Sequence, residues 1–153
     1  SPVFIIAQAA LESGWGKSAI GKYNVFGITR GGWPVEKCLL VTTHEYFKTK
    51  TVRFTAPEKV VKIEYVAGKG LYKYTCKRLF RNYATLGEAL RDHAAVLKKS
   101  WPEAWAYRMS PENYVKKIQE GRKKYATAPN YVETMGKMFG TVRKAMKEAG
   151  LSC

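Results

Sequence analysis

Glu12 lies at the end of an apolar helix pattern, in surroundings that suit a proton-donating carboxyl group. Apolar residues recur at three- and four-residue spacing before it, which predicts a helix with one buried face over residues 3–13. Ser13-Gly14 and Gly16 end this helix, and Trp15 lies between the two glycines. Because an apolar neighbourhood disfavours the charged form of a carboxyl group, its pKa rises, as the general acid of a glycoside hydrolase requires. The alternative is an ordinary solvated glutamate at a helix end.

Five stretches of the chain carry motifs that follow one another in a definite order. They are residues 7–16 (AQAALESGWG), 23–28 (YNVFGI), 42–46 (TTHEY), 80–93 (FRNY followed by EALRDH) and 125–131 (YATAPNY). In type and order they resemble the motifs of the bacterial peptidoglycan-hydrolysing glucosaminidase family, glycoside hydrolase family 73, which includes flagellar rod hydrolase domains and autolysins. The resemblance covers nearly the whole chain. Its one visible departure is Ala128, where the family carries an aspartate.

The resemblance implies a fold, an activity and a location. The fold is α+β and mostly helical, with a lysozyme-like helical body and a small antiparallel β-lobe at about residues 36–83, in a single domain over residues 1–153. The activity is that of an endo-β-N-acetylglucosaminidase that hydrolyses β-1,4 bonds of peptidoglycan glycan strands, with Glu12 as the general acid. A muramidase, a lytic transglycosylase and a weakly catalytic cell-wall-binding module are the alternatives. The resemblance also implies that residues normally precede Ser1, and that the protein acts outside the cytoplasm, whether secreted, periplasmic or in the cell wall, with a phage as one source.

A second catalytic group is expected in the β-lobe, because glycosidases usually employ two carboxylates. Glu45 lies in a strand-like run, and the family carries an acid at the matching position, so Glu45 is the expected partner of Glu12. A surface glutamate on an alternating strand is the alternative interpretation. The other acids of the same region are Glu36, Glu58 and Glu64. A route assisted by the substrate's own acetamido group would need only Glu12 as the acid.

Further residues are expected to bind the sugar. Tyr125 combines an apolar ring, which can stack on a sugar face, with a hydroxyl group that can hold the acetamido group, and Tyr131 is the second choice. Asp92 is expected to tune the site or to support the β-lobe. The residues expected to line the floor of the cleft are Trp15, Asn24, Phe26 and Gly27, the last because glycine permits a close approach of the backbone. Trp15 and Phe26 are equally consistent with packing.

The middle of the chain predicts a small sheet. β-Branched and aromatic residues concentrate at residues 38–43, 59–66 and 71–83. Ala67-Gly68-Lys69-Gly70 lies between the last two runs and predicts a hairpin turn.

Helix signals fill the rest of the chain. Thr85 and Glu88 have the spacing of a capping box and open a helix to about Lys99. Two more helices are expected, from Ser110-Pro111-Glu112 to Gly121 and from Pro129 to Gly150.

The composition of the chain indicates which classes of partner it can bind. Lys and Arg number 27 against 12 acids, which gives a net charge of +15 and favours an anionic polymer or surface. The sequence shows no helix-turn-helix, zinc-finger or aromatic-strand signature, so peptidoglycan is preferred and no nucleic acid is expected. No run of eighteen apolar residues predicts a membrane span, and the chain is expected to act as a monomer.

Cysteine and histidine are too sparse to predict a metal site. The chain has three cysteines without a Cys-Xaa-Xaa-Cys motif, and its only histidines are His44 and His93. Neither a metal nor another cofactor is expected. Cys38 and Cys76 both lie in strand-like runs, so a disulfide between them across the sheet is one option, while Cys153 is expected to be free.

Overall fold

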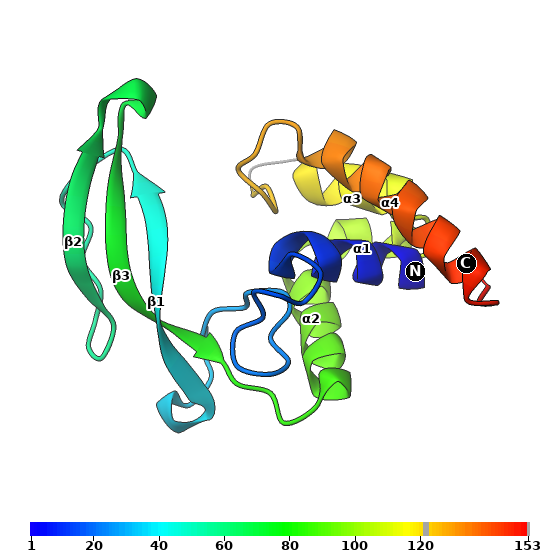
Figure 1. Cartoon of the computed structure of the whole chain (residues 1–153), viewed down its shortest axis with the longest axis horizontal. Helices are drawn as coiled ribbons and strands as arrows, with labels where there is room; N and C mark the ends of the chain where they lie inside the picture. Colours follow the sequence, from blue (N-terminus) through cyan, green and yellow to red (C-terminus); the bar gives the residue numbers. More distant parts are fainter. Residues whose placement is uncertain (121–122, 153) are drawn as a thin grey trace.

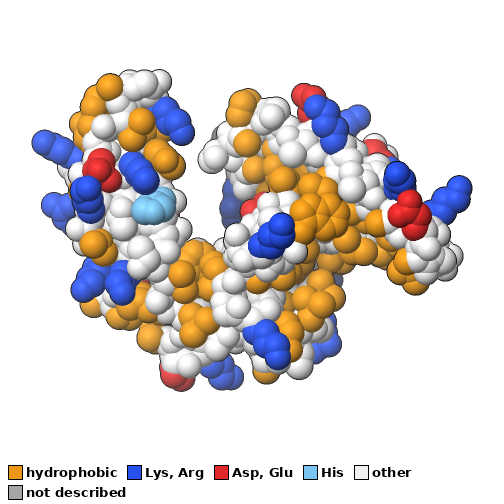
Figure 2. Space-filling view, in the orientation of Figure 1, with side chains coloured by type: hydrophobic (Ala, Val, Ile, Leu, Met, Phe, Trp, Pro, Cys, Tyr) orange, Lys and Arg blue, Asp and Glu red, His pale blue; other side chains and the backbone are white. Residues whose placement is uncertain are grey.

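The chain folds into a helical body and a β-lobe that join at one end and stand apart at the other (Figure 1). This computed structural model describes residues 1–120 and 123–152. A deep, open notch separates the two parts on the surface (Figure 2). The elements are α1 (Pro2–Ser13), η1 (Val35–Lys37), β1 (Cys38–Phe47), β2 (Lys59–Val66), η2 (Ala67–Lys69), β3 (Leu71–Arg81), α2 (Leu86–Ser100), η3 (Pro102–Tyr107), α3 (Pro111–Gln119) and α4 (Tyr131–Glu148). The α+β, mostly helical architecture expected from the sequence is confirmed.

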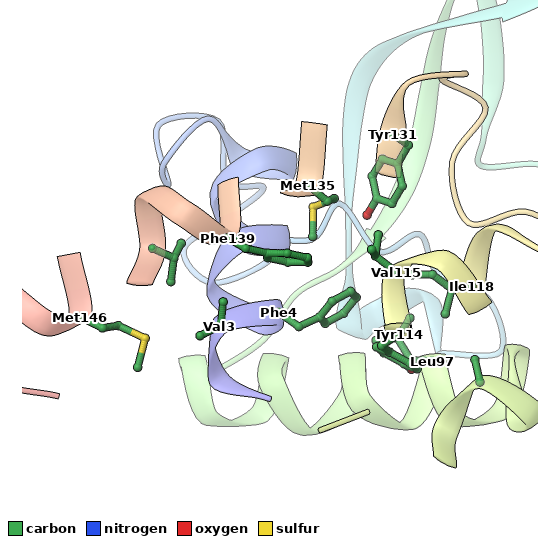
Figure 3. Close-up of a cluster of buried hydrophobic side chains, with 13 residues drawn as sticks. Val3, Phe4, Leu97, Tyr114, Val115, Ile118, Tyr131, Met135, Phe139 and Met146 are labelled. Carbon is green, nitrogen blue, oxygen red and sulfur yellow. The ribbon is translucent and has the colours of Figure 1, made fainter. Parts of the chain in front are cut away.

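The core of the helical body forms around α1. Val3, Phe4 and Ala7 lie on one face of this helix and are buried against α3 and α4. The Phe4 and Tyr114 rings pack edge to face with 4.8 Å between their centroids, and Figure 3 shows Phe4 among the buried side chains of the neighbouring helices. Each large apolar side chain buried in this way contributes roughly 1.5–3 kcal/mol to folding. The core therefore fixes α1, and with it the helix end that carries Glu12.

The sheet of the β-lobe is antiparallel with the strand order β1-β3-β2. Residues 67–70 form the expected turn between β2 and β3, and Gly70 takes a left-handed conformation there with φ 62°. Residues 48–58 cover one face of the sheet. The Tyr74 hydroxyl donates to the Thr49 carbonyl oxygen at 2.9 Å, and the Leu79 N–H donates to the Glu58 carboxylate at 2.8 Å. The sheet consequently has a covered face and an open face.

Several boundaries differ from the expected ones. β1 extends to Phe47 rather than ending at 43, because it pairs with β3 along its whole length. α4 begins at Tyr131, since Pro129 lies in a turn that the Tyr131 N–H closes on the Ala128 carbonyl oxygen. The expected end of α3 at Gly121 lies outside the described residues, and the helix ends at Gln119.

The capping box before α2 is present in a shifted form. The Thr85 hydroxyl accepts from the Glu88 N–H at 3.1 Å, as expected. The Glu88 carboxylate accepts from the Ala84 N–H at 2.8 Å rather than from that of Thr85. The short helix η3 was not predicted from the sequence.

The expected option of a disulfide between Cys38 and Cys76 is wrong. Cys38 lies opposite Arg81 in the β1–β3 register, while Cys76 lies opposite Thr43. Five residues of strand, about 16 Å, separate the two positions, which is far beyond the reach of a disulfide. Cys76 is buried, and the Cys38 thiol donates to the Pro34 carbonyl oxygen. Both thiols are free.

In the part of the chain that the structure describes, no helix combines the length and the apolar character needed to cross a membrane.

Candidate active site

The end of α1 holds Glu12 on rigid backbone. The N–H groups of Gly14 and Trp15 both donate to the Ala10 carbonyl oxygen, which ends the helix abruptly after Ser13. The Ser13 hydroxyl donates to the carbonyl oxygen four residues earlier at 2.6 Å. Trp15 has φ 61°, a left-handed conformation that costs a non-glycine residue roughly 1–3 kcal/mol. Such strain is typical of functional sites, and here it terminates the helix immediately after the candidate acid.

Glu12 borders a pocket of about 510 Å³ on the helical body. The pocket lies between the end of α1, the segment before α4 and the first turn of α4. Its lining residues are Leu11, Glu12, Tyr125, Ala126, Thr127, Ala128, Tyr131 and Thr134. The structure therefore brings together three residues predicted from the sequence, Glu12, Tyr125 and Tyr131. None of these described lining residues is a lysine or arginine, and none comes from the β-lobe.

The two tyrosines form one aromatic unit. The Tyr125 ring stacks on Tyr131 with 5.5 Å between centroids and an interplanar angle of 29°. The Trp101 ring packs beside the Tyr125 ring with 5.4 Å between their centroids. The Tyr125 N–H donates to the Ile118 carbonyl oxygen at 3.0 Å, which ties this segment to α3. Packing of this kind fixes the direction in which both phenols point.

Gln8 is a site residue that the sequence analysis missed. Its side chain is completely buried, one turn before Glu12 on α1. The Gln8 amide donates to the Tyr131 hydroxyl oxygen at 2.9 Å, so Tyr131 keeps its own proton to donate elsewhere. Within the described structure, the Gln8 side-chain oxygen has no hydrogen-bond partner. The available signal was a polar residue within the apolar run that precedes Glu12.

The pocket favours neutral groups. The Glu12 side chain is exposed, yet the surrounding protein displaces enough water that desolvation raises the pKa of its carboxyl group. Burial, and then the charge of Glu12, raise the pKa of Tyr125 well above its ordinary value. Burial likewise raises the pKa of Tyr131. A carboxyl group whose pKa is raised beside two phenols is suited to general acid catalysis.

Glu45 lies elsewhere, on the covered face of the β-lobe. Its carboxylate pairs with the Arg78 guanidinium at 2.5 Å, and the same guanidinium pairs with Glu58 at 3.0 Å. Arg78 also lies over the Phe54 ring, 4.2 Å from the centroid. The structure thus engages Glu45 within its own lobe and does not place it in the Glu12 pocket.

The expectation that Asn24 lines the cleft is corrected by the structure, which buries its side chain. Phe26 is also buried, in agreement with the packing role that was its alternative. The Asn24 amide donates to the carbonyl oxygens of Ile28 and Arg81 at 2.9 Å, and its oxygen accepts from the Ile28 N–H. Phe26 stacks on the His93 ring at 3.7 Å between centroids. These residues therefore connect the loop after α1 to β3 and α2. Both side chains are buried because β3 and α2 contact the loop at these two positions.

Asp92 belongs to the same joint between the two parts. Its carboxylate accepts from the Arg81 guanidinium at 2.6 Å and from the Tyr83 hydroxyl. These contacts fix the end of β3 against α2, in agreement with the supporting role that the sequence analysis gave as one option. Gly27, in contrast, is exposed, with φ 61° and open space around it.

Trp15 lies on a different surface from the Glu12 pocket. Its side chain is 56% exposed and borders a second, apolar groove of about 680 Å³ between α1 and α2. Other residues of this groove include Ile6, Leu86 and Met109. The left-handed backbone at Trp15 turns the chain away from Glu12, so Trp15 lies near the acid in the sequence but not in the pocket.

Among the described residues, no cluster of three or more His, Cys, Asp or Glu side chains could hold a metal ion.

Comparisons with known proteins give the family. Residues 1–144 match the glucosaminidase family, described as mannosyl-glycoprotein endo-beta-N-acetylglucosaminidase. The peptidoglycan hydrolase FlgJ of Salmonella typhimurium is 32% identical, over 94% of this chain and 40% of the relative. The corresponding FlgJ of Pseudomonas aeruginosa is 27% identical, over 88% of this chain and 30% of the relative. A probable N-acetylmuramidase of Lactococcus lactis is 29% identical, over 90% of this chain and 28% of the relative.

A solved structure agrees with these matches. The C-terminally truncated glycoside hydrolase domain of Salmonella typhimurium FlgJ aligns with a TM-score of 0.57 and 28% identity, over 94% of this chain and 84% of that one. The chain spans less than half of the length of the curated relatives named above. Taken together with the ordered motifs and the lysozyme-like arrangement, the match over residues 1–144 shows that the chain belongs to the glucosaminidase family of glycoside hydrolases.

Proposed function

We propose that the chain is an endo-β-N-acetylglucosaminidase that hydrolyses β-1,4 bonds of peptidoglycan glycan strands, with Glu12 as the general acid. The observation that carries this proposal is the Glu12 carboxyl group, which is held at a rigid helix end and whose pKa is raised by desolvation beside two tyrosines. The names of the FlgJ relatives, as peptidoglycan hydrolases, support the choice of substrate.

The pocket favours a route in which the substrate's acetamido group takes part. Glu12 gives its proton to the glycosidic oxygen as the bond from that oxygen to the anomeric carbon breaks. The acetamido oxygen of the same sugar then bonds to the anomeric carbon, and the Tyr125 hydroxyl holds this group in place. Water afterwards opens the cyclic intermediate, and the Glu12 carboxylate accepts a proton from that water. This route uses only groups that line the pocket, whereas a direct role for Glu45 would require the β-lobe to approach the helical body.

The bond that is cut can be identified chemically. The relatives include peptidoglycan hydrolases, whose names specify no bond, and a probable N-acetylmuramidase. The reaction products therefore have to identify the bond that is cut. We expect purified peptidoglycan digests, reduced with borohydride and examined by mass spectrometry, to carry N-acetylglucosaminitol at the new ends. N-Acetylmuramitol would make the chain a muramidase, and anhydro-muramic ends would make it a lytic transglycosylase. Absence of new ends, with the protein folded and bound to the polymer, would leave only a binding module. The Glu12→Gln variant is the control for contaminating activity.

The same proposal locates the chain outside the cytoplasm, because its substrate lies there. Fractionation of the source cells or phage particles, with antibody detection, tests this location. Detection in the cytoplasm alone would contradict it.

A further inference from the structure

The open face of the sheet carries a set of polar and charged side chains that the proposed reaction does not use. Alternate residues of β3 point to this face, and the register gives their neighbours on β1 and β2. The open face is defined by Thr42, His44 and Tyr46 on β1, Lys59, Lys62 and Glu64 on β2, and Lys73, Thr75 and Lys77 on β3. Four of these nine residues are lysines, and Glu64 is the one acid among them.

The arrangement of the lysines is unfavourable for the protein by itself. Lys59 lies directly opposite Lys77 in the β2–β3 register, and like charges in directly opposite positions destabilise a sheet. Glu64 pairs with Lys62 at 2.9 Å. Within the described residues, neither Lys59 nor Lys77 has an ion pair with a carboxylate. An anion supplied from outside would remove this repulsion.

The open face adjoins the notch. β1 is an edge strand of the sheet and the strand nearest to the helical body, while residues 48–58 run behind the strands (Figure 1). In the same orientation, Figure 2 looks onto the open face and shows Lys and Arg side chains across it, beside the opening of the notch. A polymer that lies in the notch would therefore pass along this face as it leaves.

We propose that the open face binds the carboxylates of the stem peptides that a peptidoglycan strand carries beside the notch. This inference rests on the proposed function, because only a peptidoglycan substrate brings stem peptides to the protein. Lysine ammonium groups are compact point charges that can contact single carboxylates in varied positions, whereas arginine holds carboxylates and phosphates through two parallel hydrogen bonds. The arginines of β3, Arg78 and Arg81, are already engaged in ion pairs with acids of the protein. The cations left for a ligand are thus lysines, whose point charges suit peptide carboxylates that arrive in varied positions along a polymer.

The test compares two double variants that each remove two positive charges. Lys59→Gln with Lys77→Gln changes the open face, and Lys144→Gln with Lys147→Gln changes exposed lysines of α4 as the matched control. Binding is measured with soluble peptidoglycan fragments that keep their stem peptides and with the same fragments after an amidase has removed them. Cleavage of both fragments and of a neutral chitooligosaccharide is measured in parallel.

We expect the Lys59/Lys77 variant to bind peptide-bearing fragments roughly threefold to tenfold more weakly at low salt, with peptide-free fragments and chitooligosaccharide unaffected. Its Tm should not fall, because the repulsion between the two lysines is gone. Equal weakening on peptide-free fragments, or equal weakening in the α4 control, would overturn the inference. So would a loss seen only on walls that carry phosphate polymers. If the parent protein binds peptide-bearing fragments through Lys59 and Lys77 but cleaves no substrate, the proposed function fails and the peptide-binding face does not.

Discussion

Two glutamates of this chain, Glu12 and Glu45, have opposite surroundings. Glu12 lies in a pocket of the helical body without a lysine or arginine among its described lining residues, and desolvation raises the pKa of its carboxyl group. Glu45 lies in the β-lobe and shares the guanidinium of Arg78 with Glu58. The same residue type thus serves two purposes. Desolvation in the helical body favours the protonated form of Glu12, whereas Glu45 in the β-lobe pairs with the Arg78 guanidinium. The difference assigns proton donation to the helical body.

The two regions are also stabilised in different ways. The core of the helical body consists of thirteen buried apolar residues from several helices, Phe4 among them. The β-lobe consists of one sheet and the segment 48–58, and its buried side chains include Tyr74 and Cys76. Ion pairs of Arg78 and Arg81 supplement this thin layer. The body is therefore the part that can hold a partly desolvated acid beside strained backbone, and the lobe is the part that can present charge to an anionic polymer.

The sharpest test of this division is Glu12→Gln. Glutamine keeps the shape of the side chain but cannot donate the proton, so activity on peptidoglycan should fall by about 100- to 10,000-fold. Desolvation raises the pKa of Glu12 above its ordinary value of 4.5. The charged carboxylate therefore lowers the stability of the folded protein as the pH rises above 4.5. The neutral amide removes this penalty, and the Tm at pH 7 should stay the same or increase. Residual activity above about a tenth of the parent value would refute the assignment of the acid.

The second test uses the two histidines, one in each region. Burial lowers the pKa of His93 to about 4 from 6.5, while the charge of Asp92 partly opposes this. The unfolded chain binds the proton more readily, so the stability that neutral His93 provides is complete above pH 6.5 and is lost as the pH falls toward 4. Urea unfolding should show a loss of about 2–3 kcal/mol from this residue between pH 7 and pH 4.5.

His93→Leu should abolish that part of the pH dependence. His44→Gln is the matched control, because His44 lies on the open face of the β-lobe and its side chain is exposed. If the His93 variant keeps the full pH dependence of the parent, buried His93 is not the group responsible.

The sequence predicted the part of the site that depends on local pattern. Apolar periodicity and the glycines after Ser13 place Glu12 at a helix end, and neither requires knowledge of the rest of the fold. The environment of Glu45 could not be predicted in the same way. It depends on the face of β1 that residues 48–58 cover, and this follows from strand register and a long loop.

Long-range contacts also explain the other differences. Asn24 and Phe26 are buried because β3 and α2 approach the loop after α1, and no local motif encodes that approach. Trp15 turns toward a separate groove through a left-handed backbone conformation that a tryptophan seldom adopts. Local motifs therefore identified Glu12, Tyr125 and Tyr131 as residues of one pocket, but did not reveal the burial of Asn24 and Phe26.

The third test measures the role of the β-lobe acid. Glu45→Ala should lower turnover by less than about tenfold, well below the effect at Glu12, because the proposed route needs only groups of the pocket. Arg78 keeps its pair with Glu58 in this variant, so folding should persist. Glu64→Ala, on the open face, is the matched control. A loss at Glu45 as large as that at Glu12 would show that the lobe closes over the pocket and that Glu45 is the second catalytic carboxylate. A large loss at Glu64 instead would identify that residue.

The smallest expected effect concerns Gln8, which we assign as a positioning residue for Tyr131. Gln8→Leu removes the hydrogen bond to the Tyr131 hydroxyl, which contributes about 1 kcal/mol, and also removes a buried oxygen without a partner, which costs about 1–3 kcal/mol. The two terms nearly cancel or favour the variant, so the Tm should not fall. We expect kcat to drop severalfold with KM little changed, since the phenol would no longer be oriented beside Glu12.

A cycle with Tyr131→Phe separates positioning by Gln8 from a purely structural role. If Gln8 acts through the Tyr131 hydroxyl, then Gln8→Leu should have little further effect on kcat in the Tyr131→Phe background. Equal effects in both backgrounds would mean that Gln8 influences the reaction without Tyr131. A lower Tm with unchanged kcat would mean that it serves only the core. Because the buried residues of α1 before Ser13 are otherwise apolar, a polar side chain that adds no stability there is best explained by the orientation it imposes on the pocket.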